Sequence, residues 1–522
     1  MLAQNHHRGI EGDGWFWRLD GDEDDAKPGR LTAHLGGSIT LELSTPMLTE
    51  ARPWPSTSND VRSACAIYGL VGSTRVTLLG ARVAGLSQTS TTALADRERL
   101  DIDTAVIGAH LPVIGRRDRT VGVITDALLV EFELLETWLG RRGIHIEMRG
   151  RSGDDRFTSA TVQFDYPDTL TAPIDGGHLE LQTEWTPPTY DEDVVGVRTG
   201  TLLRVILDSP RDVDEAIHHA ASVQLLLALL TSAAPDVLNL RLHHPDRRAG
   251  QRGDLPLYDP VALVYRWSRR RPEQQSAPLT SPFSDSREAL LDFEELGGID
   301  ALAAWTSIAN ELHLILSLLT SAAFVERLPH ENAFLNVTSA AEGLHRHWYP
   351  VSKDDEKAAK RWVATILNKL ESLPRDDRQR VKGKLKRAHE PSLERRLREL
   401  ADRLPLTAAA LTDNDVSTWS AAVAWVRNQL AHPNSPAEVK EREERGLYPA
   451  SGFEYLFLAH SVYWLTTAAL VAELGVSDAL IAERISDHEL HWKNQRAHDA
   501  VSRWRRDDEA GVAGFVRPGD DP

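Results

Sequence analysis

The chain has 522 residues, of which 41% are hydrophobic and 26% charged, a balance that excludes a disordered protein and, at this length, favours several domains. Its formal net charge of −18 argues against indiscriminate nucleic-acid binding, which needs clustered Lys and Arg. The single cysteine, Cys65, excludes an internal disulfide and a thiolate metal cluster, as is typical of proteins of the reducing cytosol.

The charge is distributed unevenly along the chain. Residues 1–300 carry a net charge of −15 and residues 301–522 carry −3, whereas residues 351–400 carry +6. The first residues contain no basic segment followed by an apolar one, so we expect no secretory signal and a cytoplasmic protein. An acidic front half is thus joined to a back half with one locally basic stretch.

Residues 1–205 are expected to form a β-rich domain, built as a sandwich or a strongly curved sheet. Short segments such as SITLELS, TRVTLLGARV and TLLRVILD mix β-branched residues with alternating polarity, and Gly, Pro or Asp clusters separate them. The aromatic cluster Trp15, Phe16 and Trp17 is expected in the core of this domain.

Residues 206–325 are expected to be a helical middle region with a connector. Apolar residues take up helical spacing from Val213, DVLNLRL could add one last strand, and residues 250–285 have the composition of a connector. Residues 326–490 are expected to form a helical bundle and residues 491–522 a C-terminal tail, whose last residues, DDEAGVAGFVRPGDDP, are expected to be disordered. The expected fold class is therefore α+β multidomain, a β-rich domain followed by an all-α bundle.

In the back half we expect helices over 299–325, 330–349, 355–372, 376–404, 414–432 and 452–486. Residues 452–472 are long and apolar enough to resemble a membrane span, but both flanks continue as polar helix, so we expect a buried helix and no membrane contact.

The helix 414–432 carries the residues with the clearest chemical potential. Asp413 or Asp415 is placed to cap its start, and Pro433 prevents its continuation. Its last turn holds Arg427, Asn428 and His432. Arg427 and His432 would diverge by roughly 140° on a regular helix. However, a residue that precedes proline is biased out of the helical region, so the imidazole can turn toward the guanidinium.

An arginine beside a histidine can move a phosphoryl group without a metal, because the guanidinium stabilises phosphate charge and the imidazole transfers protons near neutral pH. Cleavage of RNA by its own 2′-hydroxyl needs both a base and an acid. One chain offers a single histidine in this motif, so two copies across a two-fold axis would supply both groups, which favours a homodimer. By spacing alone, the simpler reading is structural, with Arg427 solvated, Asn428 near the cap and His432 at the end of the helix.

The string RNQLAHP resembles the R-N-x-x-x-H signature of HEPN domains, helical bundles that act mostly as ribonucleases or RNA-binding modules. The segments GWFWRLDGDEDDAKPGRLTAHLGGSITLELS and YGLVGSTRVTLLGA resemble the start of the N-terminal domain of ApeA-like proteins, which carry a HEPN domain behind it. The two resemblances cover most of the chain in the expected order.

The resemblance to ApeA-like proteins implies defence against phage by abortive infection, in which RNA cleavage arrests the infected cell. It implies Arg427 and His432 as catalytic residues, with Asn428 beside them, and a β-rich domain that senses a phage-derived trigger. Many HEPN domains also use a polar residue of an earlier helix, and Glu342 is our candidate. The resemblance suggests RNA, in particular tRNA, as the substrate.

A basic segment, residues 377–399, lies between these helices. Its cations Lys382, Lys384, Lys386 and Arg387 are candidates for contacts to an RNA backbone, although solvated helix faces have the same composition. The histidine pairs lack the H-E-x-x-H spacing of a helical metal site, and no phosphate-binding loop is present, so we expect neither a metal nor a cofactor. The alternative function is a non-catalytic HEPN module that binds nucleotide, RNA or protein.

Overall fold

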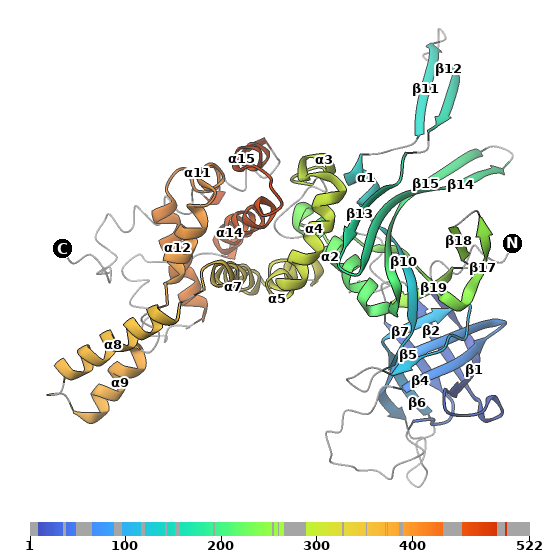
Figure 1. Cartoon of the computed structure of the whole chain (residues 1–522), viewed down its shortest axis with the longest axis horizontal. Helices are drawn as coiled ribbons and strands as arrows, with labels where there is room; N and C mark the ends of the chain where they lie inside the picture. The colour runs from blue at the N-terminus through green and yellow to red at the C-terminus, as the bar shows by residue number, and fades with distance from the viewer. Residues whose placement is uncertain are drawn as a thin grey trace. The chain divides into compact units, whose positions relative to one another are not determined.

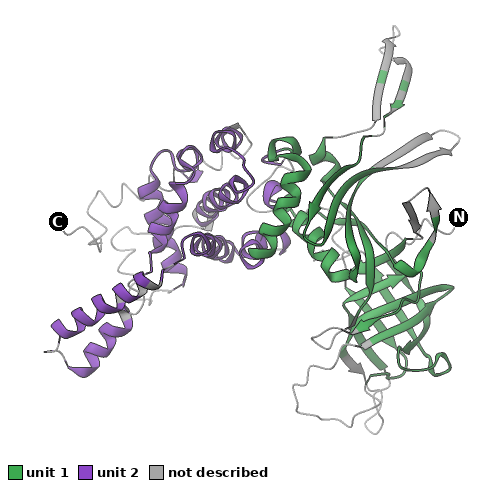
Figure 2. Ribbon diagram, viewed as in Figure 1, with its two compact units in different colours: residues 1–228, 233–279, 292–311 green, residues 229–232, 280–291, 312–522 purple. Residues whose placement is uncertain are grey.

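The computed structural model divides the chain into two compact units (Figure 2). Unit 1 comprises residues 1–228, 233–279 and 292–311, and unit 2 comprises residues 229–232, 280–291 and 312–522. The structure describes residues 9–34, 38–48, 65–87, 97–115, 121–140, 144–151, 157–165, 167–191, 194–252, 255–258, 260–265, 289–325, 328–350, 352–370, 372, 374–385, 390–431, 452–487, 496–497 and 499.

Six antiparallel strands at the start of unit 1 close into a barrel (Figure 1). They are β1 (Gly9–Arg18), β2 (Lys27–His34), β3 (Ile39–Leu43), β4 (Cys65–Val71), β5 (Thr74–Ser87) and β6 (Arg97–Ile102). The ring closes because β5 pairs with β6 as well as with β4. Apolar residues at alternate positions, such as Ile39, Leu41 and Leu43, fill the interior, as strand geometry requires.

The barrel shares its sheet with the rest of unit 1. The same sheet continues from β5 through seven further strands in the order β7 (Thr104–Ile107), β19 (Val261–Tyr265), β16 (Val237–His243), β10 (Ile124–Phe132), β15 (Val194–Asp212), β14 (Gly177–Asp191) and β13 (Leu170–Ile174). Three small hairpins are separate: β8 (Ile114–Gly115) with β9 (Val121–Gly122), β11 (Ile144–Arg151) with β12 (Phe157–Phe164), and β17 (Arg248–Arg252) with β18 (Leu255–Tyr258).

Helices complete unit 1. They are the 3-10 turns η2 (Glu23–Asp25) and η3 (Pro245–Arg247), and the helices α1 (Leu135–Leu139), α2 (Val213–Thr231), α3 (Phe293–Leu296) and α4 (Gly298–Glu311), of which the last three residues of α2 belong to unit 2. Helix α4 packs on β13 and β14 and is fixed to α2 by the buried Trp305, whose Nε1–H donates to the Ser222 carbonyl over 2.7 Å.

The segment DVLNLRL forms β16, the further strand that the sequence allowed. The strands differ from the sequence expectation in two respects. The segment 250–285, expected as a connector, contributes β19 to the sheet, and β16 and β19 are inserted between β10 and β7 and connect the two halves of the sheet. The aromatic cluster is also split by the two-residue repeat of β1: Phe16 points into the barrel core, whereas Trp15 and Trp17 lie on the opposite face. There Trp17 is buried against Tyr68 and His110, but Trp15 is 55% exposed, so its expected place in the core is wrong. Of the two architectures expected, the strongly curved sheet is the closer one.

Unit 2 is helical. Its helices are α5 (His313–Leu319), α6 (Ser321–Phe324), α7 (His330–Trp348), α8 (Lys353–Lys369), α9 (Arg375–Leu385), α10 (Leu393–Ala401), α11 (Pro405–Thr412), α12 (Val416–Ala431), α14 (Gly452–Ala472) and α15 (Asp478–Asp487). Helix α7 packs against α5, α10, α12 and α14, and α8 and α9 form a hairpin (Figure 1). A β-rich region followed by a helical region is the expected fold class.

Helix α14 is the core of unit 2. Its window Tyr455–Ala472 is long and apolar enough to cross a membrane, but 83% of this window is buried by the rest of the protein. The tyrosine hydroxyl of Tyr463 donates to the Leu229 carbonyl over 2.8 Å, and both groups are buried. This burial is typical of a core helix in a soluble protein.

Several helix limits differ from those expected. The expected helix 452–486 ends at Ala472 and restarts at Asp478, because Gly475 adopts a left-handed conformation with φ of +92°. The expected helix 376–404 consists of α9 and α10, and the sequence patterns gave no indication of α11. Asp413, with φ of +52°, terminates α11 and separates it from α12.

Candidate active site

Helix α12 carries the candidate catalytic arginine on a well-fixed support. Asp415 is the residue that caps its start, since its carboxylate accepts from the Thr418 amide over 3.0 Å. Trp419 and Val423 are buried, and the indole Nε1–H of Trp419 donates to the hydroxyl of Ser461 on α14 over 2.8 Å. Helix α12 is therefore fixed by a cap at its start and by buried side chains along its length.

Arg427 lies on this turn and faces Glu342 of α7. The guanidinium Nη2 is 3.6 Å from the Glu342 Oε1, and the two side chains are 31% and 15% exposed. The Nη1 of Arg427 also donates to the side-chain oxygen of Asn428 over 3.4 Å, while Asn428 itself is exposed. The structure thus brings together three of the sequence candidates, whereas His432 lies outside the described residues.

Glu342 is shared between two arginines. Its second oxygen, Oε2, is 3.6 Å from Nη2 of Arg346, one turn further along α7, and Arg346 is also 3.8 Å from Glu390. Each oxygen of this carboxylate therefore faces one guanidinium. The two guanidinium groups balance the negative charge of Glu342, and the carboxylate in turn restrains Arg427 from one side.

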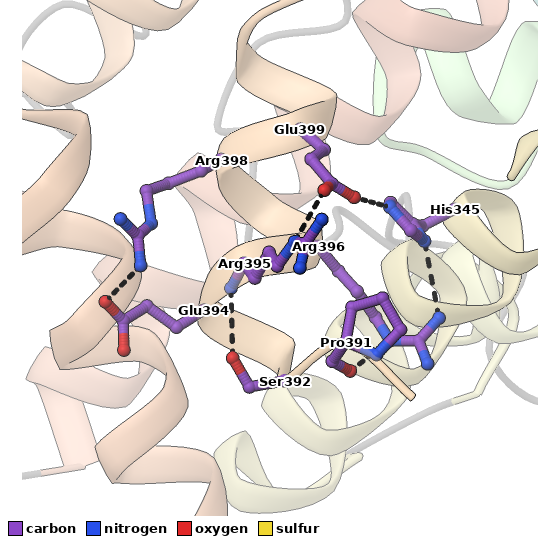
Figure 3. A network of polar contacts seen from close by, with 8 residues as sticks. All are labelled: His345, Pro391, Ser392, Glu394, Arg395, Arg396, Arg398 and Glu399. Atoms are coloured by element: carbon purple, nitrogen blue, oxygen red, sulfur yellow. Dashed lines mark hydrogen bonds and ion pairs between the residues drawn. The ribbon is translucent and has the colours of Figure 1, made fainter. Parts of the chain in front are cut away.

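A second polar cluster lies where α10 packs on α7 (Figure 3). His345 is buried, and its Nε2 is 2.5 Å from a carboxylate oxygen of Glu399. Arg396 is also buried, donates from Nε to the Pro391 carbonyl over 2.9 Å, and places Nη1 3.3 Å from the Nδ1 of His345. Since arginine can only donate, Nδ1 must accept, and His345 is the neutral tautomer that carries its proton on Nε2.

The electrostatics of the cluster agree with this assignment. Burial lowers the pKa of His345; the hydrogen bond to Glu399 opposes this shift and the charge of Arg396 adds to it. Burial, and then repulsion from Arg346, lower the pKa of Arg396. Burial would raise the pKa of Glu399, but hydrogen bonds from Arg395 and His345 outweigh it and lower the pKa. At neutral pH, a charged arginine and a charged carboxylate therefore hold a neutral imidazole between them.

The candidate RNA-binding cations are only partly described. Lys382 is exposed on α9, the side chain of Lys384 is not described, and Lys386 and Arg387 lie outside the described residues. Within the described part of the α8–α9 hairpin, no side chain is fully buried, and Trp362 of α8 is 51% exposed.

The sequence patterns did not single out Arg346, Arg396 or Glu399, and they marked His345 only as one of the histidine pairs without metal-site spacing. A signal for Arg346 existed, because it follows Glu342 by four residues and such residues share a helix face. Nothing local indicated that the α10 residues would meet α7. Among the described residues, no group of three or more His, Cys, Asp or Glu could hold a metal ion.

Two protein-family models match the sequence, and one of them gives the class of the helical unit. The model for the Apea-like HEPN domain matches residues 335–480, a range that contains Glu342, Arg427 and most of the helices of unit 2. The model for ApeA N-terminal domain 1 matches residues 11–305, more than half of the chain, which therefore belongs to the ApeA-like HEPN family. This membership suggests an anti-phage HEPN protein and is compatible with a nuclease. No curated protein and no solved structure matches the sequence.

Proposed function

We propose that the protein is a cytoplasmic, homodimeric HEPN endoribonuclease that defends bacteria against phage by abortive infection. The observation that carries this proposal is the Arg427–Glu342 ion pair at the end of a well-anchored helix, in a chain of the ApeA-like HEPN family. A carboxylate that holds the motif arginine in place is the arrangement that phosphate recognition needs, because the guanidinium must be oriented before the substrate arrives.

The proposed reaction is an intramolecular transesterification that needs no metal. A histidine takes the proton of the ribose 2′-hydroxyl, whose oxygen attacks the adjacent phosphorus, and the bond from phosphorus to the 5′-oxygen breaks. A second histidine gives its proton to that leaving oxygen. Arg427 stabilises the charge that develops on the phosphoryl oxygens, and Asn428 orients Arg427 or the imidazole. The products are a 2′,3′-cyclic phosphate and a 5′-hydroxyl.

Two copies of the chain would provide the two histidines, since His432 occurs once per motif. The substrate would be single-stranded or loop RNA, because in-line attack needs an unstacked backbone, and tRNA loops are suitable candidates. Lys382, Lys384, Lys386 and Arg387 would contact the RNA backbone. Contacts of this kind are expected to contribute affinity without sequence preference.

The β-rich unit would hold the nuclease inactive until it meets a phage-derived trigger. The barrel has an open pocket of about 490 Å³ lined by, among others, Trp15, Arg30, Glu42 and Arg97. An exposed indole between charges of both signs suits a peptide or a small charged molecule. Replacement of Trp15 by alanine is therefore the first variant to test for a loss of triggering with intact nuclease.

The proposal is tested by comparing the wild-type protein with Arg427→Ala and His432→Ala in phage-challenged cells. Protection and total RNA integrity would be measured in the same cultures, with EDTA in the extracts. We expect both variants to lose protection and to lose RNA ends that carry 2′,3′-cyclic phosphate. Wild-type protection without new RNA ends, or equal protection by the variants, would instead support a non-catalytic binding module.

A further inference from the structure

The end of α7 presents a partly exposed aromatic ring that lies against a buried imidazole. Tyr349 follows the last residue of α7 and is 42% exposed. Its ring lies on the imidazole of His345, with centroids 4.7 Å apart and planes inclined by 30°. The Tyr349 amide donates to the His345 carbonyl over 2.8 Å, which continues the helical hydrogen bonding. The Tyr349 ring is thus a stacking platform supported by the imidazole of His345, and not a loose surface side chain.

The backing ring is unusually well fixed. His345 is held at both nitrogens, by Glu399 at Nε2 and by Arg396 at Nδ1. Because Arg396 is itself buried and bonded to the Pro391 carbonyl, the imidazole cannot rotate without breaking several hydrogen bonds. A planar group that stacked on Tyr349 would extend an ordered stack and would lose little side-chain entropy.

A cation lies beside this platform. Arg346 lies in the last turn of α7 and precedes the C-cap residue Tyr349 by three residues, the spacing at which side chains at a helix end are neighbours. Its side chain is 56% exposed, and its contacts to Glu342 and Glu390 are 3.6 and 3.8 Å long, ion-pair distances that exceed a hydrogen bond. Donors of the Arg346 guanidinium therefore remain available to an acceptor.

The same carboxylate joins Arg346 to the candidate active site. Glu342 faces Arg346 with one oxygen and Arg427 with the other. A strand whose scissile phosphate lies on Arg427 would pass its neighbouring nucleotide across Glu342 to Arg346. The carboxylates of Glu342 and Glu390 beside Arg346 repel additional negative charge. A ligand with a single phosphodiester charge is therefore favoured over a nucleoside triphosphate.

We propose that the end of α7 is a nucleotide subsite, in which Arg346 binds a backbone phosphate of single-stranded RNA and Tyr349 stacks on its base. The proposal rests on the function proposed above for its substrate class, and it assigns the position of the flanking nucleotide. Stacking needs an unpaired base, so the subsite selects single strands over duplexes.

The test measures binding alone, in full-length protein that carries His432→Ala so that RNA is not cleaved. A short fluorescein-labelled single-stranded RNA is titrated by fluorescence anisotropy at several salt concentrations. Tyr349→Ala should weaken binding roughly 5- to 100-fold, and Tyr349→Phe should retain most of the affinity, because stacking uses the ring and not the hydroxyl. Arg346→Met should reduce the slope of log affinity against log salt by about 0.7, the value for one phosphate contact on a single strand.

Two control variants remove comparable side chains that have no part in the proposed RNA contacts. Trp15→Ala removes an aromatic side chain of similar exposure in unit 1, and Arg398→Met removes an arginine that pairs only with Glu394 among the described residues. Both should bind as the parent protein does. Duplex RNA should bind equally to the parent and to Tyr349→Ala.

Affinity of Tyr349→Ala equal to that of the controls would overturn the subsite, as would an equal loss with Tyr349→Phe or with duplex RNA. An absence of any RNA binding by the parent would overturn it as well. If the variants behave as expected while the wild-type protein leaves RNA intact, the subsite stands and the nuclease proposal fails. If the wild-type protein cleaves RNA while the variants bind normally, the nuclease stands and the subsite fails.

Discussion

Replacement of Arg396 by methionine tests whether the buried cluster between α7 and α10 stabilises unit 2. The substitution keeps an unbranched apolar stem but removes the donors to the Pro391 carbonyl and to the Nδ1 of His345. His345 is 1% exposed, so its Nδ1 would remain buried without a donor. Pro391 is only partly buried, and water can replace the lost donor at its carbonyl.

The magnitude follows from these losses, from the loss of the 3.9 Å ion pair to Glu390, and from one gain. A buried acceptor left without a partner costs about 1–3 kcal/mol, and a hydratable carbonyl or a partly exposed ion pair costs close to the lower end of that range or less. Removal of the guanidinium returns part of this cost, since taking a charge out of water is unfavourable even when it is paired. We therefore expect the free energy of unfolding of unit 2 to fall by roughly 2 kcal/mol.

The assay is urea unfolding at neutral pH, with hydrogen exchange of peptides from α7 and α10 to assign the change to unit 2. Arg398→Met is the control, because its ion pair with Glu394 is solvent-exposed and should contribute less than about 1 kcal/mol. A double variant, Arg396→Met with His345→Phe, also removes the nitrogen that the first substitution leaves without a donor. Its free energy of unfolding should exceed the value expected from adding the two single changes by about 1 kcal/mol or more.

Two results would refute the reasoning. If Arg396→Met unfolds with the same free energy as the Arg398→Met control, the buried guanidinium makes no net contribution. If the single changes simply add in the double variant, His345 and Arg396 are not energetically coupled, and the tautomer assigned from their contact loses its support.

Three further predictions concern other parts of the chain. Glu342→Gln should lower single-turnover RNA cleavage by roughly fivefold, since a partly exposed ion pair to Arg427 contributes about 1 kcal/mol; unchanged cleavage would separate this carboxylate from the reaction. Ser461→Ala should destabilise unit 2 by about 1–3 kcal/mol, as measured in urea, because the buried indole N–H of Trp419 loses its acceptor, and an unaffected midpoint would contradict this. Burial and two neighbouring arginines lower the pKa of His243 from 6.5 to about 4, so the unfolded chain binds a proton that the folded one does not. The urea stability of unit 1 should therefore fall from pH 6.5 toward pH 4, and a His243→Gln variant with the same slope would exclude this histidine as the cause.

Local features of the helical unit were predictable from the sequence. The cap at Asp415 and the end of α12 near Pro433 follow from short-range chemistry, and the buried course of α14 follows from its composition and flanks. Glu342 was selected as an earlier-helix partner from the family resemblance, and it lies against Arg427. The role of both residues in catalysis stays a prediction.

Features that depend on distant segments were not predictable. Strand β5 pairs with three other strands, and β19 pairs with β7 although about 150 residues separate them, so no local pattern encodes the barrel or the limits of the sheet. Arg396 has the appearance of one more cation in a basic run, yet packing of α10 on α7 buries it. Burial of a charged residue is decided by tertiary contacts that a window of sequence does not contain.

The late strands have a consequence for how the chain can be shortened. Strands β16 and β19 lie between β10 and β7, so a protein that ended near residue 205 would lose both and split the sheet in two. The newly exposed edges of β7 and β10 would present rows of unpaired backbone groups, which promote aggregation. The two halves of the sheet likewise cannot join during synthesis until residue 265 has left the ribosome, so their edges stay open over the intervening stretch of the chain.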